Sequence, residues 1–158
     1  MSELSTSAQR VQDALDASGV ATRIVEYDVP ARTSAEAAAV LGCAVGQIAK
    51  SLVFRSAAGT PVLVIASGAH RVDEGKIAAL AGEAIGKADA SFVRAATGYA
   101  IGGIPPLAHA TRSRTFIDRN LLAFETVYAA GGTPHAMFPI APADLVRVSQ
   151  GTVADTAP

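Results

Sequence analysis

Two largely apolar runs, 47–54 and 62–66, lie in the centre of the sequence and are joined by the turn Ala58-Gly59-Thr60-Pro61. Apolar runs of this length that are bounded by turn residues predict β-strands. Because the apolar residues in both runs are nearly continuous, we expect other elements to cover both faces of these strands. The chain must therefore place this pair of strands inside the fold.

Helices and short strands interleave irregularly along the rest of the chain. Apolar residues recur at helical spacing within 5–18, and Ser34 and Gly42 are typical of a helix start and a helix end. The patterns predict helices at 5–18, 34–41, 72–81 and 89–96, strands at 22–27, 115–118, 125–129, 136–140 and 146–148, and helical turns at 119–122 and 142–145. This order favours one α+β domain on a mixed sheet over residues 1–150, followed by a loose tail at 151–158.

Composition limits the classes of function. Only 17% of the 158 residues are charged and the net charge is −1, which argues against coating nucleic acid through a broad basic surface. The single Cys43 has no basic neighbour in sequence, which indicates a structural thiol, and no histidine pair has metal-ligand spacing. The sequence also lacks the nucleotide-binding glycine motifs, so we expect neither a metal nor another cofactor.

No apolar run approaches the length that spans a membrane, and the first residues lack the pattern of a signal peptide. These features predict a cytoplasmic protein without a membrane partner.

The segment Gly102-Gly103-Ile104-Pro105-Pro106 combines two glycines with two prolines. A rigid loop with few side chains can present backbone N–H groups to an oxygen atom, and a simple tight turn is the alternative. Lys50 is the second notable feature, because it interrupts an apolar strand. A lysine in this position either extends to solvent at the edge of the sheet or waits in a cleft for an anion.

Three segments, 33–38, 48–54 and 102–106, resemble in their order and separation the YbaK family of aminoacyl-tRNA deacylases. That family is related to the editing domain of bacterial prolyl-tRNA synthetases. The loop 102–106 fits the family's G-x-x-x-P pattern, segments 116–122 and 130–135 add weaker support, and the resemblance covers about residues 5–150. It implies a curved, barrel-like mixed sheet flanked by helices.

The resemblance also implies roles for three residues. Lys50 matches the family's essential lysine, which would contact the terminal adenosine or the ester, and Gly102 and Gly103 would supply the backbone wall of the pocket. Donors in such a wall stabilise the oxyanion that forms when an ester is hydrolysed.

Further residues are candidates for substrate binding. Thr33 lies at a helix start whose amides can face an oxygen, while Ser34 is expected to be the N-cap. Tyr27 either stacks on a base or packs in the core. His135 either positions the attacking water or substrate amine, or belongs to a surface loop.

Ser51 and Pro105 complete this set, Ser51 as the neighbour of Lys50 and Pro105 as a residue that keeps the glycine loop rigid. Asp118 is expected to cap the helical turn that follows it, with orientation of Lys50 as the alternative. None of the serines has the G-x-S-x-G setting of a covalent nucleophile.

The first functional hypothesis is a freestanding trans-editing deacylase that hydrolyses Ala-, Cys- or Ser-tRNA, for example on tRNA-Pro. Its partners would be the acceptor end of the tRNA and possibly an aminoacyl-tRNA synthetase, with no specific DNA binding. The alternatives are a non-catalytic module of the same fold that binds RNA or a synthetase, and a small-molecule esterase.

Overall fold

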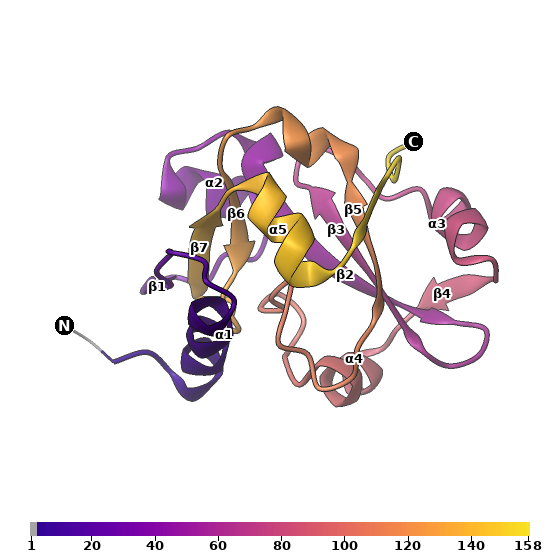
Figure 1. Cartoon of the computed structure of the whole chain (residues 1–158), viewed down its shortest axis with the longest axis horizontal. Helices are drawn as coiled ribbons and strands as arrows, with labels where there is room; N and C mark the ends of the chain where they lie inside the picture. Colours follow the sequence, from indigo (N-terminus) through magenta and orange to yellow (C-terminus); the bar gives the residue numbers. More distant parts are fainter. Residues whose placement is uncertain (1–2) are drawn as a thin grey trace.

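Eight strands form one mixed sheet within residues 3–158, which are the residues that the computed structural model describes (Figure 1). The strands are β1 (Val25–Glu26), β2 (Ile48–Ser56), β3 (Pro61–Ser67), β4 (Ile85–Lys87), β5 (Arg114–Asp118), β6 (Val127–Ala130), β7 (Ala136–Ile140) and β8 (Thr152–Ala154). Their order is β1-β7-β6-β2-β3-β5-β8, and β4 pairs with β2. The predicted central hairpin is confirmed, because β2 and β3 pair in antiparallel register.

Helices flank this sheet and complete the predicted α+β class. They are α1 (Thr6–Ala17), α2 (Ser34–Leu41), α3 (Glu74–Ala81), α4 (Ala90–Thr97) and α5 (Pro142–Ser149), with short 3-10 turns η1 (Val45–Gln47) and η2 (Arg119–Ala123). Figure 1 shows α1 and α2 at the end of the molecule that contains β6 and β7, and α3 with β4 at the other end.

Both faces of the central hairpin are covered, as its apolar runs predict. Leu15 of α1 and Leu145 of α5 belong to the cluster on one face, with Ile65 of β3. Ile77 of α3 packs on the other face against Val64. Each of these side chains is fully buried, and burial of an aliphatic side chain of this size contributes about 1.5–3 kcal/mol. This double cover holds the two central strands in place.

Three predictions of local structure need correction. The strand expected at 22–27 is reduced to Val25–Glu26, because only these two residues pair with β7. Residues 146–148 belong to α5 and form no strand, since the buried Leu145 and the partly buried Val148 keep the helix packed on the core. The strand Ile85–Lys87 was not predicted, because it contains a glycine and is only three residues long.

The prediction of a loose tail at 151–158 is also wrong. β8 runs parallel to β5 and pairs with its last three residues, 116–118. Thr156 and Ala157 are buried, and the Asp73 amide donates a hydrogen bond to the Thr156 carbonyl at 2.8 Å. The sequence gives no local sign of this, because the partners of the segment come from distant parts of the chain.

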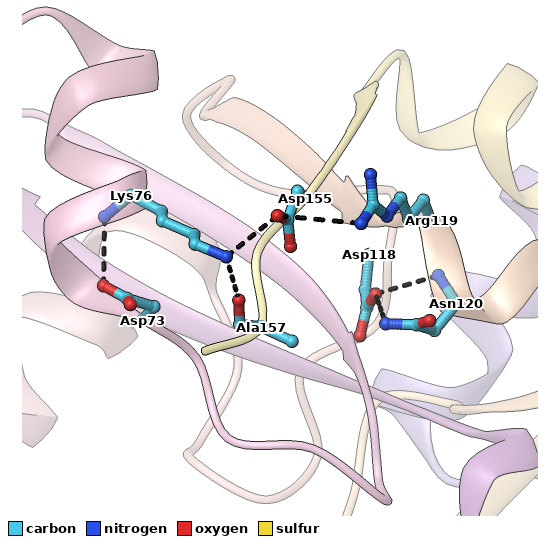
Figure 2. Close-up of polar contacts among 7 residues, drawn as sticks. All are labelled: Asp73, Lys76, Asp118, Arg119, Asn120, Asp155 and Ala157. Atoms are coloured by element: carbon cyan, nitrogen blue, oxygen red, sulfur yellow. Dashed lines mark hydrogen bonds and ion pairs between the residues drawn. The ribbon is translucent and has the colours of Figure 1, made fainter.

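Lys76 of α3 fastens the same segment by its ammonium group (Figure 2). Its Nζ lies 2.8 Å from Asp155 Oδ2 and also donates to the Ala157 carbonyl. Arg119 approaches the same carboxylate at 3.7 Å. The hydrogen bond from Lys76 lowers the pKa of the Asp155 carboxyl. The C-terminal segment is therefore held by both backbone pairing and charge.

One edge of β2 is incompletely paired. β6 pairs with residues 48–49 and β4 with residues 54–56, so residues 50–53 have no partner strand on this edge within the described chain. In an antiparallel pair, only every second residue of a strand forms hydrogen bonds with the partner strand. At the two ends of the β2–β3 hairpin the bonded residues of β2 are even-numbered, because the Gly68 amide donates to the Ile48 carbonyl and the Ser56 amide donates to the Thr60 carbonyl. Ser51 and Val53 therefore direct their backbone groups into this gap in the sheet.

Candidate functional site

A cleft of about 530 Å³ lies along this gap, within the size range of small-molecule sites. Most of its lining comes from four parts of the chain: the start of α2 with the residues before it, the first half of β2, the loop after α4, and one residue each of β6 and β7. The lining residues are 31–35, Ala37, Val45, 48–52, Gly68, Ile101, Gly102, Ile104, Ala130 and Met137. The structure thus brings together Thr33, Lys50, Ser51 and Gly102 of the predicted site.

The interior of the cleft is lined mostly by small or apolar side chains. Ala37, Ala49, Ala130 and Met137 present small or apolar groups, and each of the first two is almost fully buried. Ile101 lies at the mouth, where 58% of it is exposed. Polar groups are few, so those that reach the cleft dominate what it can bind.

Lys50 is the one lysine among the lining residues, and it is half-buried. Because side chains alternate along a strand, it shares a face of β2 with Ile48 and Leu52. Within residues 3–158 no hydrogen bond or ion pair satisfies its ammonium group. A cation in a mostly apolar cleft without a protein partner favours an anionic or carbonyl ligand.

The start of α2 forms one wall of the cleft, and it corrects one prediction. Thr33 is the N-cap, because its Oγ1 accepts a hydrogen bond from the Glu36 amide at 3.1 Å, whereas Ser34 is the first helical residue. A side chain at Gly68 would lie 2.7 Å from Ser34 Cβ. The absence of a side chain there lets the end of β3 and the start of α2 pack closely, which places Thr33 at the cleft.

Ile101, Gly102 and Ile104 of the loop after α4 also line the cleft, and the amides of this loop differ in their hydrogen bonding. The Gly103 amide donates to the Ala100 carbonyl at 3.0 Å, and a side chain at Gly103 would lie 2.6 Å from the Thr133 backbone. Gly103 therefore packs against a neighbouring loop and is absent from the cleft lining. The amides of Gly102 and Ile104, both on the lining, have no hydrogen-bond partner in the described part of the chain.

Pro105 and Asp118 lie outside the cleft, although both were predicted to serve substrate binding. Pro105 is buried. Asp118 is fully buried, and its carboxylate accepts hydrogen bonds from the Ser67 amide at 3.1 Å and from the Asn120 amide at 2.9 Å. Figure 2 shows Asp118 turned toward Asn120. The expected capping role is confirmed, and the carboxylate also ties β3 to η2.

Tyr27 and His135 meet each other and do not line the cleft. The Tyr27 amide donates to the His135 carbonyl at 2.8 Å, and His135 Nδ1 lies 3.0 Å from the Tyr27 carbonyl. Burial raises the pKa of Tyr27. The Ala31 amide donates to the Pro134 carbonyl at 2.9 Å, so the loop 131–135 supports the segment that leads into the cleft.

Ser51 lines the cleft from β2, but its hydroxyl is turned inward. The Ser51 Oγ atom is buried and has no hydrogen-bond partner among residues 3–158. An unpaired buried hydroxyl of this kind costs free energy unless a ligand or a water molecule satisfies it. The structure therefore agrees with the predicted position of Ser51 and adds an unsatisfied polar atom.

Sequence reasoning missed several lining residues, among them Arg32, Ile101, Ala130 and Met137. Arg32 directly precedes the predicted Thr33, and Ile101 directly precedes the glycine loop. Their position next to a predicted site residue could therefore have indicated both of them as lining residues. Ala130 and Met137 reach the cleft only through the pairing of β6 and β7, which no local pattern indicates.

Residues 3–158 contain no group of three or more His, Cys, Asp or Glu side chains placed to hold a metal ion. The same part of the chain has no helix with the length and apolar character needed to cross a membrane.

Comparison with known proteins gives consistent results. The family model for the aminoacyl-tRNA editing domain matches residues 28–148. The uncharacterized protein YwhH of Bacillus subtilis is 29% identical over 126 residues, which is 80% of each chain. A crystal structure of a proposed trans-editing enzyme for prolyl-tRNA synthetase superposes with a TM-score of 0.93 at 43% identity over 99% of both chains.

A crystal structure of the hypothetical protein APE2540 has a TM-score of 0.87 and 34% identity, covering 94% of this chain and 99% of that one. Because the family model spans most of the sequence and two solved structures share both fold and more than 30% identity, the chain belongs to the aminoacyl-tRNA editing-domain family.

Proposed function

We propose that this member of the editing-domain family is a freestanding deacylase that hydrolyses the ester bond of a mischarged aminoacyl-tRNA. The observation that carries the proposal is that Lys50, Gly102 and Ile104 line one cleft, and that the Lys50 ammonium and the two amides have no partner within residues 3–158. The substrate class rests on the family and on the likeness to a proposed trans-editing enzyme. In this proposal the acceptor end of the tRNA is the partner that enters the cleft.

The reaction needs little covalent chemistry from the protein. Water adds to the ester carbonyl, the bond to the ribose oxygen breaks, and that oxygen leaves with a proton as the tRNA hydroxyl. In this proposal the amides of Gly102 and Ile104 are the donors that hold the oxyanion, and Lys50 is the cation that contacts the terminal adenosine or the ester region. Fixed donors of this kind contribute about 10²–10³ each in rate.

The proposed amino acids are small, with Ala, Cys and Ser as the candidates. Ala37, Ala49, Ala130 and Met137 line the cleft together with Lys50. A pocket separates side chains that differ by one methylene by only about 1–3 kcal/mol, so these substrates are compared directly in the experiment.

The rival function is a non-catalytic module that binds RNA or a synthetase through the same fold. It requires no specific role for Lys50 beyond surface charge. Deacylation that depends on Lys50 but not on another lysine of the sheet therefore favours the deacylase over the binding module.

The experiment is a deacylation panel of Ala-, Cys- and Ser-tRNA with proline, threonine and lysine acceptors. We expect the wild-type protein to hydrolyse one member rapidly and the Lys50→Ala variant to lose about 10²-fold or more in kcat/KM. Lys87→Ala is the control, because Lys87 is an exposed lysine on β4, next to the far end of β2.

Equal rates for wild type and Lys50→Ala would remove Lys50 from the mechanism. No hydrolysis of any member by folded wild-type protein would reject the deacylase function and favour the binding module. A simple amino acid ester as substrate tests the third possibility, since an esterase would cleave it without the tRNA.

A further inference from the structure

We propose that His109 is a positioning residue that holds the Gly102–Pro106 loop in the conformation in which Gly102 and Ile104 line the cleft. This inference rests on the proposed deacylase function for its kinetic consequences, but the contact itself is independent of that function. His109 lies outside the cleft and was given no role by the sequence.

The loop has few attachments of its own. Within residues 101–107, one backbone bond is formed, from the Gly103 amide to the Ala100 carbonyl, and it closes a local turn. Pro105 and Pro106 have no N–H group to donate. Ile104 and Leu107 pack in the core, and a side chain that donates a hydrogen bond to a carbonyl group between them adds a polar attachment to this packing.

His109 supplies that donor. Its Nε2 lies 2.6 Å from the Pro105 carbonyl oxygen, and because a carbonyl only accepts, Nε2 carries the hydrogen. In the described chain, no other side chain is hydrogen-bonded to residues 101–107. Burial lowers the pKa of His109, which favours the neutral ring, and in the neutral ring the bonded Nε2 is the one N–H donor.

Two contacts hold the base of the loop next to His109. The buried Tyr99 donates its hydroxyl hydrogen to the Ala108 carbonyl at 3.0 Å, which joins the two ends of the loop. Ala108 has a φ of +65°, a left-handed conformation that alanine adopts only when its surroundings hold it. The Arg10 guanidinium lies 5.3 Å from the centre of the Tyr99 ring and links this base to α1.

The same loop separates two spaces in the protein. Gly102 and Ile104 face the cleft, whereas Pro106, Ala108 and His109 line a smaller cavity of about 220 Å³ on the other side. Pro105, whose carbonyl His109 holds, directly follows Ile104 and is three positions after Gly102, so fixing Pro105 restricts both of these cleft residues. A displacement of such hydrogen-bond donors by about 1 Å can lower the rate of the catalysed reaction about 10²-fold.

The test compares His109→Phe, which keeps a ring without a donor, with His109→Gln, whose side-chain amide can donate from nearly the same distance. We expect His109→Phe to lower kcat by about tenfold to hundredfold with KM changed less than about twofold, and His109→Gln to recover most of the loss. Ser113→Ala is the matched control, because the Ser113 hydroxyl lies buried beside the same small cavity without a partner in the described residues.

Hydrogen exchange of the peptide 99–109 provides a readout that needs no substrate. The Gly103 amide should exchange faster in His109→Phe than in wild type and return toward the wild-type rate in His109→Gln. If wild type fails the deacylation panel, the proposed function is rejected while this exchange measurement still decides the role of His109.

Two outcomes would overturn the inference. The first is an unchanged kcat and exchange pattern in His109→Phe. The second is equal loss of activity and of thermal stability in His109→Phe and His109→Gln, which would mean that the imidazole only fills space.

Discussion

Lys50 and Lys76 both lie partly inside the fold, and their surroundings differ. The Lys76 ammonium donates hydrogen bonds to Asp155 and to the Ala157 carbonyl. The Lys50 ammonium lies in a cleft beside unpaired amides and has no partner within residues 3–158. The polar contacts of Lys76 therefore stabilise the fold, whereas the polar groups of the cleft remain available for a ligand.

This contrast separates two kinds of substitution. Changes around Lys76 should alter stability and leave chemistry intact, and changes around Lys50 should do the reverse.

Asp118→Ala should lower the free energy of unfolding by about 3 kcal/mol, because it leaves the Ser67 and Asn120 amides without their buried acceptor. Urea denaturation measures this loss. Asp89→Ala is the comparison, since Asp89 caps α4 at an exposed site and should cost only about 1 kcal/mol. A fall in kcat of Asp118→Ala at a temperature where it is folded would instead give Asp118 a role at Lys50.

Deletion of residues 152–158 should lower stability by about 2 kcal/mol, because it removes the β5–β8 pairing and the buried Thr156 and Ala157. The deacylation rate per folded molecule should stay unchanged. A thermal melting temperature equal to that of the full chain would show that the segment contributes nothing to stability.

The two lysines should respond in opposite ways to replacement by methionine. Lys76→Met should cost at most about 1 kcal/mol, since the ion pair with Asp155 is partly exposed, with 37% and 40% of the two side chains accessible. Lys50→Met should leave stability unchanged or raise it by up to about 1 kcal/mol while activity is lost. Chemical denaturation of both variants measures the difference, and destabilisation by Lys50→Met would contradict the contrast.

Acid should weaken the C-terminal region in particular. Lys76 lowers the pKa of Asp155 in the folded protein, so the unfolded chain binds this proton at a higher pH than the folded one. The stabilisation is present above the ordinary value of 3.8 and is lost as the pH falls through the lower folded pKa. The urea midpoint of wild type should therefore fall more between pH 5 and pH 3 than that of Lys76→Met, and parallel curves would exclude this contribution.

Local patterns predicted the parts of the fold that local interactions control. The central hairpin was recognised because its two apolar runs are joined by a turn with glycine and proline. The stretch 146–148 was read as a strand because two valines alternate with an arginine, but packing of α5 on the core overrides that preference.

The site was only partly predictable for a similar reason. Lys50 and Gly102 are candidates from sequence because each belongs to an unusual pattern that a short stretch of sequence shows. Lys50 is a charge in an apolar strand, and Gly102 begins a glycine–proline loop. The distinction between Gly102 and Gly103 depends on the neighbouring Thr133 backbone. That neighbour is remote in sequence, so no local pattern assigns the two glycines to different sides of the loop.

The pairing of β2 with β6 also determines when the cleft can exist during protein synthesis. Ile48 pairs with Tyr128, and Ala130 and Met137 complete the walls beside Lys50. A ribosome produces Lys50 early and these wall residues late. A nascent chain that stops after β5 therefore carries the lysine without an enclosing pocket, so an interrupted translation product cannot present the finished cleft to the aminoacyl-tRNAs around it.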